Sequence, residues 1–293
     1  MTRTARKSRQ ARATAPATAK VREVFVARPF QHLASETDWV ALRELVPAAS
    51  APLRLTAELV ERYGERPVTV ATVLPMAWPA MTKKDGRVLI GLQRYLPSAD
   101  PSQDLAAALL AALQTEPGDQ VAVPAQPGPG PRLQDLLTDG ALDVTVHDGF
   151  EFWLDEEPPD EVKSSLERAN ASLHPTVKLA AAPAAYWSRM PEKAHVRWVL
   201  PDDEEAALRA LTRLAADGTL RLGEQTKFAG MFRALGLLIP VWDLPAAAPA
   251  PEWEEPLAAL AGRYAEALAD DTPLSPEQRR ARQGLLGRQL TLR

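Results

Sequence analysis

Apolar residues alternate along some segments of the chain and recur every three or four positions along others, and these two periods predict strands and helices. Helical spacing marks residues 38–45, where Trp39, Leu42 and Leu45 share one face and Thr37 can cap the first turn. Further helices are expected at residues 101–114, 159–173, 202–216, 225–235, 256–269 and 276–290. Strands are expected at residues 53–59, 67–73, 87–93, 142–146, 150–154, 176–179, 195–200, 220–222 and 237–242.

Two of these expectations depend on particular local signals. An Asp-Gly turn within residues 147–149 would join the strands at 142–146 and 150–154 as a hairpin. A stripe of large apolar side chains at helical spacing predicts the helix at 225–235, and Gly236 would end it.

A repeated pair of residues indicates an internal duplication. Trp78 and Met81 stand three positions apart, and so do Trp187 and Met190. Each pair lies in a predicted loop that follows a strand containing a Thr-Val pair and precedes a strand and an Ala/Leu-rich helix. We therefore expect an α+β fold built from two related β-loop-β-α halves with flanking helices.

Changes in composition predict five segments along the chain. Residues 1–28 are basic and short of large apolar side chains, which is typical of a disordered arm. Residues 29–118 would form the first half, residues 119–131 a Pro/Gly-rich linker and residues 132–245 the second half. Residues 246–293 would hold a second linker and the C-terminal helices.

Charge is distributed unevenly along the 293 residues, whose formal net charge is −4. Residues 1–22 carry seven basic residues and no acidic one, residues 272–293 are also basic, and residues 23–271 carry −15. An acidic body repels phosphate, so a contact with nucleic acid would begin at the termini. The residues expected to make it are Arg3, Arg6, Lys7, Arg9, Arg12, Arg279, Arg280 and Arg282. The arm could equally be a solvated tail, and the last helix could dock on the acidic body or lie on anionic lipid.

Two similar halves packed together would leave a cleft between them, which is a common place for a ligand. The candidates to line this cleft are Trp78, Trp187, Tyr186 and His195. An indole beside proline offers a flat binding surface at low entropic cost. The two tryptophans could instead fill corresponding corners of a divided core.

Several kinds of chemistry have no support in the sequence. The absence of Cys excludes disulfides, thiolate metal sites and cysteine nucleophiles. The four histidines show no metal-ligand spacing, and there is no Gly-x-Ser-x-Gly motif or phosphate-binding glycine loop. The acidic residues at 202–205 suit the start of a helix, where carboxylates complement the dipole. The sequence therefore assigns no catalytic residue, no metal and no cofactor.

Membrane and export signals are also missing from the pattern. No apolar run approaches the roughly 20 residues that span a bilayer. The basic N-terminus is not followed by the apolar segment of a secretory signal. With the lack of Cys, this predicts a cytoplasmic protein.

Several longer phrases resemble an uncharacterised actinobacterial family of unknown function. They lie at residues 30–55, 69–81, 100–118 and 222–244, and the resemblance spans roughly residues 29–293. Some members of that family are labelled preprotein translocase SecA-like, a label associated with a cysteine-rich zinc motif that this chain lacks. The label implies a secretion-related chaperone, but it brings no functional residue to this sequence.

The charge distribution favours a non-enzymatic binding or adaptor protein. Its anionic partner, RNA or the ribosome, would contact the basic termini. An enzyme of unknown class that uses the cleft between the halves is one alternative, and a secretion-related chaperone is another. A protein partner and the oligomeric state are left open.

Overall fold

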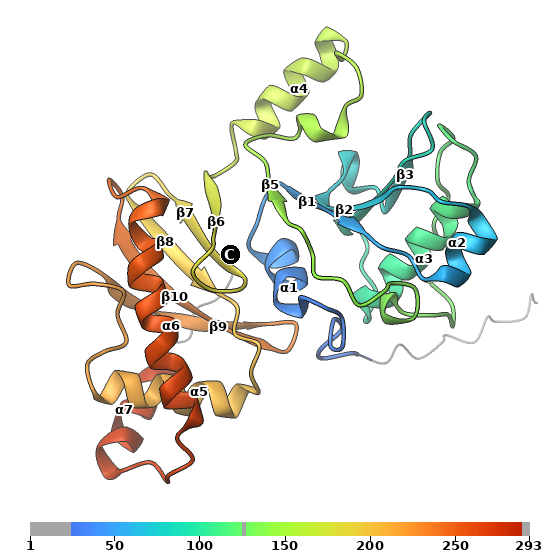
Figure 1. The fold of residues 1–293 in the computed structure, drawn as a ribbon. Helices are drawn as coiled ribbons and strands as arrows, with labels where there is room; N and C mark the ends of the chain where they lie inside the picture. The colour runs from blue at the N-terminus through green and yellow to red at the C-terminus, as the bar shows by residue number, and fades with distance from the viewer. Residues whose placement is uncertain (1–24, 125–126, 289–293) are drawn as a thin grey trace, which may run out of the picture.

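The computed structural model describes residues 25–124 and 127–288 and contains two five-stranded sheets (Figure 1). The first sheet has the order β3-β4-β2-β1-β5 and comprises β1 (Ala49–Leu53), β2 (Val68–Val73), β3 (Ala80–Thr82), β4 (Val88–Gln93) and β5 (Thr145–Val146). The second sheet has the order β6-β7-β8-β10-β9 and comprises β6 (Thr176–Leu179), β7 (Ala185–Arg189), β8 (Lys193–Trp198), β9 (Lys227–Ala234) and β10 (Leu237–Pro245). The predicted α+β class is confirmed.

Two of the helices, α3 (Pro101–Gln114) and α5 (Glu204–Ala216), start where an aspartate side chain accepts hydrogen bonds from free backbone N–H groups. Asp100 accepts a hydrogen bond from the Ser102 N–H at the start of α3, and Asp203 does the same for the first turn of α5. The α-helices are α1 (Glu36–Glu44), α2 (Ala57–Tyr63), α3 (Pro101–Gln114), α4 (Asp160–Asn170), α5 (Glu204–Ala216), α6 (Glu254–Ala269) and α7 (Pro276–Leu286). No helix within the described ranges is both long and apolar enough to cross a membrane.

Helix α1 lies between the two sheets (Figure 1). Its buried Trp39 and the preceding Phe30 belong to one apolar cluster that includes Val70 and Ile90 of the first sheet and Ile239 of the second. Helix α3 covers the same face of the first sheet and contributes to that cluster. The two halves therefore share a single continuous core around α1.

The other face of the second sheet packs against α5, α6 and α7. Trp187, Trp198 and Trp242 project from three neighbouring strands into this second cluster. Leu257 of α6 and Leu285 of α7 close it from the helical side. Burial on both faces explains why this sheet contains more large apolar side chains than a half-exposed sheet needs.

Residues 225–235 contain strand β9, so the predicted helix there is wrong. Phe228 and Met231 face the helix-covered cluster, whereas Phe232 faces the α1 cluster, so the stripe divides between the two faces. Leu235 and Gly236 have φ values of 47° and 83° and make a two-residue turn into β10. Positive φ at both positions is the geometry that favours a tight hairpin, so Gly236 marks a turn rather than a helix end.

The predicted strand at 53–59 is also wrong, because β1 ends at Leu53 and α2 begins at Ala57. The hairpin expected across residues 142–154 does not form. β5 pairs with β1 instead, and Glu151–Trp153 is a short 3₁₀ helix. Residues 220–222 are not a strand. In each case the apolar run covers only a few residues, which is too short to distinguish a strand from a helix or an irregular segment.

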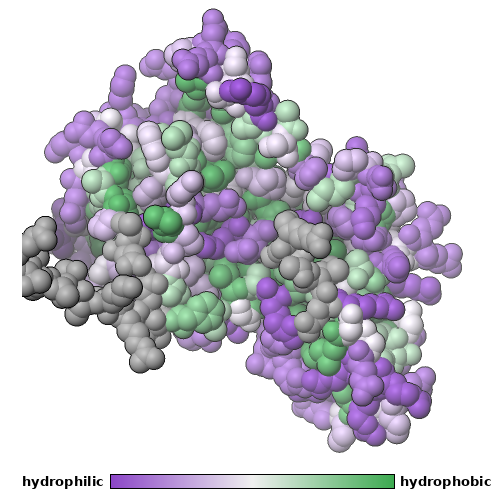
Figure 2. All heavy atoms as spheres, turned by 180° about the vertical axis from the view of Figure 1, so that it is seen from behind, coloured by the Kyte–Doolittle hydropathy of each residue, from purple (hydrophilic) through white to green (hydrophobic). Residues whose placement is uncertain are grey.

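Along the chain, the two halves have a similar succession of strands followed by a helix. Within the two sheets, however, the corresponding strands are arranged in a different order. In the first sheet β2 pairs directly with β4 in parallel, whereas in the second β7 lies between β6 and β8 and pairs antiparallel with both. The boundaries predicted for the halves stay a prediction, although β5 joins the first sheet from within residues 132–245. Helix α4 projects beyond both sheets, and Figure 2 shows this lobe at the top as mostly hydrophilic.

Candidate functional site

A row of polar side chains crosses all five strands of the second sheet. Ser188 pairs with His195, and His195 pairs with Asp243 on the next strand. Thr176 and Lys227 extend the row to the two edges of the sheet. Directly paired residues point to the same face, so the five side chains share the face that looks towards α1.

A second row lies between this polar row and the apolar core. Tyr186 pairs with Lys178 on one side and with Arg197 on the other. The Tyr186 hydroxyl donates a hydrogen bond of 2.9 Å to Oδ1 of Asp38 in α1, and Lys178 Nζ lies 2.9 Å from the same oxygen. The core thus ends at a buried charged contact, and the polar half of the face begins there.

His195 is held beside two charged groups. Its Nδ1 lies 2.9 Å from Oδ1 of Asp243, and Lys193 Nζ lies 2.9 Å from the other oxygen of that carboxylate. Both His195 Nδ1 and Asp243 Oδ1 are buried, and the ring is not aligned for a straight hydrogen bond between them. Burial lowers the pKa of His195, Asp243 raises it, and Arg197 and Lys193 lower it further. The imidazole is therefore neutral at neutral pH.

Arg197 is a half-buried charge on this face. No hydrogen bond or ion pair to its guanidinium is found among the residues described, and burial lowers its pKa. Its neighbours in the row are Tyr186 and the aliphatic Val241, neither of which carries a negative charge. A half-buried guanidinium without a carboxylate is suited to an anionic ligand, which it can bind through two parallel hydrogen bonds.

The structure brings together two of the four predicted cleft residues. Tyr186 and His195 lie on neighbouring strands and face the same way. Trp187 faces the opposite side, where it is 3% exposed. Trp78 precedes β3 of the first sheet and is 41% exposed. The tryptophans therefore do not occupy matching corners, and α1 occupies the space expected to form a cleft.

Only some of the basic residues predicted to bind nucleic acid lie within the described ranges. Arg3, Arg6, Lys7, Arg9 and Arg12 lie outside the described residues. In α7, Arg282 pairs with Glu205 at 2.7 Å, and Arg279 donates to the carbonyl oxygen of Leu274. Arg280 is exposed. Within the described part of the chain, α7 therefore docks on α5 and leaves Arg280 as its most available cation.

The acidic residues at the start of α5 each serve a local contact. Asp202 accepts a hydrogen bond of 2.7 Å from Tyr264, and Asp203 caps the helix. Glu204 pairs with Arg233, and the next glutamate pairs with α7. Across the two described ranges, no three His, Asp or Glu side chains converge as metal ligands.

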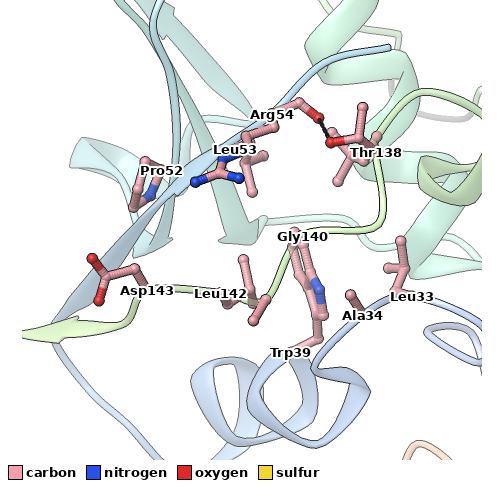
Figure 3. A pocket seen from close by; sticks show the side chains of 12 residues that line it. Leu33, Ala34, Trp39, Pro52, Leu53, Arg54, Thr138, Gly140, Leu142 and Asp143 are labelled. Carbon is pink, nitrogen blue, oxygen red and sulfur yellow. Dashed lines mark hydrogen bonds between the residues drawn. The ribbon is translucent and has the colours of Figure 1, made fainter.

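A small pocket lies between α1 and the end of β1 (Figure 3). Trp39, Arg54 and Leu142 line it, and its volume is about 110 Å³. Figure 3 shows the Trp39 ring beside Gly140, with Arg54 across the space. Ligand pockets are commonly about 300–1,000 Å³, so this one suits water rather than a substrate.

Sequence reasoning missed Ser188, Asp243 and Arg197. The signal for Arg197 was present, because Lys193, His195 and Arg197 alternate with apolar residues along one strand. Asp243 lies 48 positions after His195, and only the strand pairing brings the two together.

The chain was compared with known families, curated proteins and solved structures. Residues 29–293 match the model of a family of unknown function, DUF5926. The chain belongs to that family. No curated protein and no solved structure matches it.

Proposed function

We propose that this member of DUF5926 is a non-enzymatic binding or adaptor protein of the cytoplasm. Its anionic partner would be RNA or the ribosome, held by the basic termini and by the polar half of the second sheet. The observation that carries the proposal is Arg197, whose half-buried guanidinium lacks a partner among the described residues. Burying a charge without a partner is costly, and a phosphate oxygen would relieve that cost.

The surrounding charges support this reading. On the α1-facing side of the second sheet, Lys178, Lys193, Arg197 and Lys227 accompany only one strand carboxylate, Asp243. This local excess of positive charge contrasts with the net −15 of residues 23–271. An anion attracted by the basic arm would thus find a second positive surface on the folded body.

The test uses co-sedimentation with ribosomes and titration with a fluorescent oligouridylate. Deleting residues 1–22 is expected to lower association and to flatten its dependence on salt, because fewer counterions are released. Arg197→Gln is expected to weaken binding about tenfold, as loss of one phosphate contact does. Arg233→Gln is the matched control, because Arg233 is already paired with Glu204. Association that neither change reduces would refute the proposal.

One observation favours an enzyme as the second candidate. Ser188, His195 and Asp243 stand side by side on three neighbouring strands, and these are the residue types of a serine nucleophile, its base and its orienting acid. The lowered pKa of His195 suits a general base. Among the described atoms, however, no hydrogen bond joins Ser188 to His195.

A fluorophosphonate probe distinguishes this candidate from the first. An enzyme of this kind would be labelled at Ser188, and Ser188→Ala and His195→Gln would each abolish the label. Ser172→Ala serves as the control, because Ser172 lies in the exposed turn after α4. A chain that the probe does not modify, or that it modifies equally after Ser188→Ala, is not a serine hydrolase.

A further inference from the structure

Three large apolar side chains are displayed to solvent where the first described residues meet the loop between β4 and α3. Tyr95 is 87% exposed and Leu96 is 61% exposed, and Phe25 is 78% exposed. We call these three side chains the aromatic tip. Single exposed apolar side chains are ordinary on a protein surface, but a group of them at one place marks a contact site.

One buried carboxylate holds the loop between β4 and α3 at both of its ends. Oδ1 of Asp104 accepts a hydrogen bond of 3.0 Å from the Arg94 guanidinium, and Oδ2 accepts one of 2.8 Å from the Ser98 N–H. Asp104 itself is buried in α3. The three residues between these two anchors, 95–97, are all exposed. The Tyr95 ring is therefore presented by a fixed loop, which lowers the entropy that a ligand must remove on binding.

The segment that carries Phe25 is tied to the same loop. The Val26 N–H donates a hydrogen bond of 3.1 Å to the Ala99 carbonyl oxygen, so the backbone next to Phe25 lies beside the end of the loop. Residues 1–22, with seven basic residues and no acidic one, come two positions before this segment begins. The aromatic tip therefore stands where the basic arm joins the folded body.

The loop brings little net charge to this place. Residues 95–99 are uncharged, Arg94 is paired with Asp104, and Arg132 is paired with Asp100 at the start of α3. Positive charge beside the tip comes from the arm, whereas residues 23–271 carry −15. A broad anionic surface such as a membrane would bring its charge close to this acidic body. A single strand of RNA is narrow enough to contact the arm and the tip alone.

We propose that the aromatic tip binds single-stranded RNA by stacking unpaired bases on Tyr95 and Phe25, while the basic arm neutralises the neighbouring phosphates. This inference rests on the proposed function and narrows its partner to a strand whose bases are free. Residues 1–22 contain no aromatic residue, so the arm alone offers charge without a stacking surface. A duplex keeps its bases stacked on one another, and it would engage only the arm.

The test compares two fluorescent strands of equal length by anisotropy with the full chain. One is an oligoadenylate, and the other has the same ribose-phosphate backbone but no bases. The adenylate strand is expected to bind at least about fivefold more tightly, because stacking on an aromatic side chain strengthens binding base by base. Equal affinities, both reduced by deleting residues 1–22, would overturn the stacking inference and leave the proposed function standing. Binding of neither strand would overturn both.

Variants at one ring separate stacking from a general effect on the fold. Tyr95→Ala is expected to weaken binding of the adenylate strand about fivefold or more and to leave the strand without bases unaffected. Tyr95→Phe keeps the ring and should keep the affinity. Tyr63→Ala is the matched control, because Tyr63 accepts a bond from Gln114 at the opposite end of α3. Equal losses in Tyr95→Ala and Tyr63→Ala would contradict the proposal.

Photochemical crosslinking locates the bases without any substitution. A strand containing 5-bromouridine is expected to crosslink to Tyr95 or Phe25, identified by mass spectrometry of the digested chain. Crosslinks found only at other residues would overturn the assignment of the tip. Vesicles of phosphatidylserine and phosphatidylcholine provide the other comparison. If Tyr95→Ala weakens binding to these vesicles but not to the adenylate strand, the tip contacts a membrane surface and the proposal is overturned.

Discussion

The hydroxyl of Tyr186 donates a hydrogen bond of 2.9 Å to the carboxylate of Asp38, and this contact joins the second sheet to α1. Burial, and then the charge of Asp38, raises the pKa of Tyr186 far above its ordinary value. The phenol therefore stays protonated and keeps donating. Lys178 supplies the second partner of the same carboxylate.

Tyr186→Phe tests the strength of this junction. The change leaves buried Asp38 with Lys178 as its remaining partner, which should lower the free energy of unfolding by about 1–3 kcal/mol. Urea denaturation followed by circular dichroism measures it. Tyr63→Phe removes a hydroxyl that only accepts an exposed bond from Gln114, and it should leave the midpoint nearly unchanged. Similar midpoints for the two variants would contradict the prediction.

The stability of the chain should depend on pH through His195. Its pKa is lowered in the folded state, mainly by burial, so below the ordinary value of 6.5 the unfolded chain binds more protons than the folded chain. The contribution of His195 is therefore complete above pH 6.5 and is lost as the pH falls through the lowered folded value. His195→Asn should flatten the fall in unfolding free energy below that pH.

His147 provides the comparison for this measurement. Burial lowers its pKa too, and its ring bonds Ser50 at 2.8 Å on the first sheet. His147→Asn should therefore remove a separate part of the same pH dependence. If the profile keeps its full slope after both substitutions, the histidines are not its source.

Alanine substitutions at Gly236 and Gly64 can distinguish the cost of backbone strain from the cost of steric crowding. Gly236 and Gly64 have φ values of 83° and 80°, so alanine is strained at both. A Cβ at Gly236 would come within 2.9 Å of the Ala27 carbonyl oxygen, whereas nothing lies within 4 Å at Gly64. Gly236→Ala should lower the melting temperature clearly more than Gly64→Ala. Equal shifts would mean that the segment around Ala27 and Arg28, which precedes α1, moves aside freely.

The repeated Trp-x-x-Met pair should show two different energetic roles. Trp187→Ala removes a buried indole and should cost about 3–5 kcal/mol of unfolding free energy. Trp78→Ala removes a partly exposed one and should cost about 1 kcal/mol or less. Chemical denaturation of the two variants in parallel measures both costs. Comparable losses would restore the interpretation of two matching core positions.

Local signals in the sequence located many elements well. The capped helix after Asp100 and the amphipathic helix after Asp203 both form where periodicity predicts them, because their signals lie within a few residues. The buried strand at 237–242 and the closing helices were visible for the same reason. The α7 prediction differs only in its end, at Leu286 rather than residue 290.

What the sequence did not reveal depends on pairing between distant segments. The spacing of Phe228, Met231 and Phe232 fits either a helix or a two-sided strand, and only the presence of β10 decides. The polar row is assembled in the same way, because Ser188 and Asp243 meet His195 through register. Nothing in one strand's composition specifies its neighbour in the sheet.

Because α1 lies between the two sheets, its buried partners are synthesised at very different times. The helix is complete once Glu44 has been made, but the strand carrying Ile239, in the same buried cluster, ends only at Pro245. At about 5–20 residues per second, a nascent chain waits roughly 10–40 seconds for that partner. During this interval the apolar side of α1 lacks its cover from the second sheet. The chain emerging from a ribosome must therefore shield Trp39 in some other way, or keep it close to the first sheet, until β10 has been made.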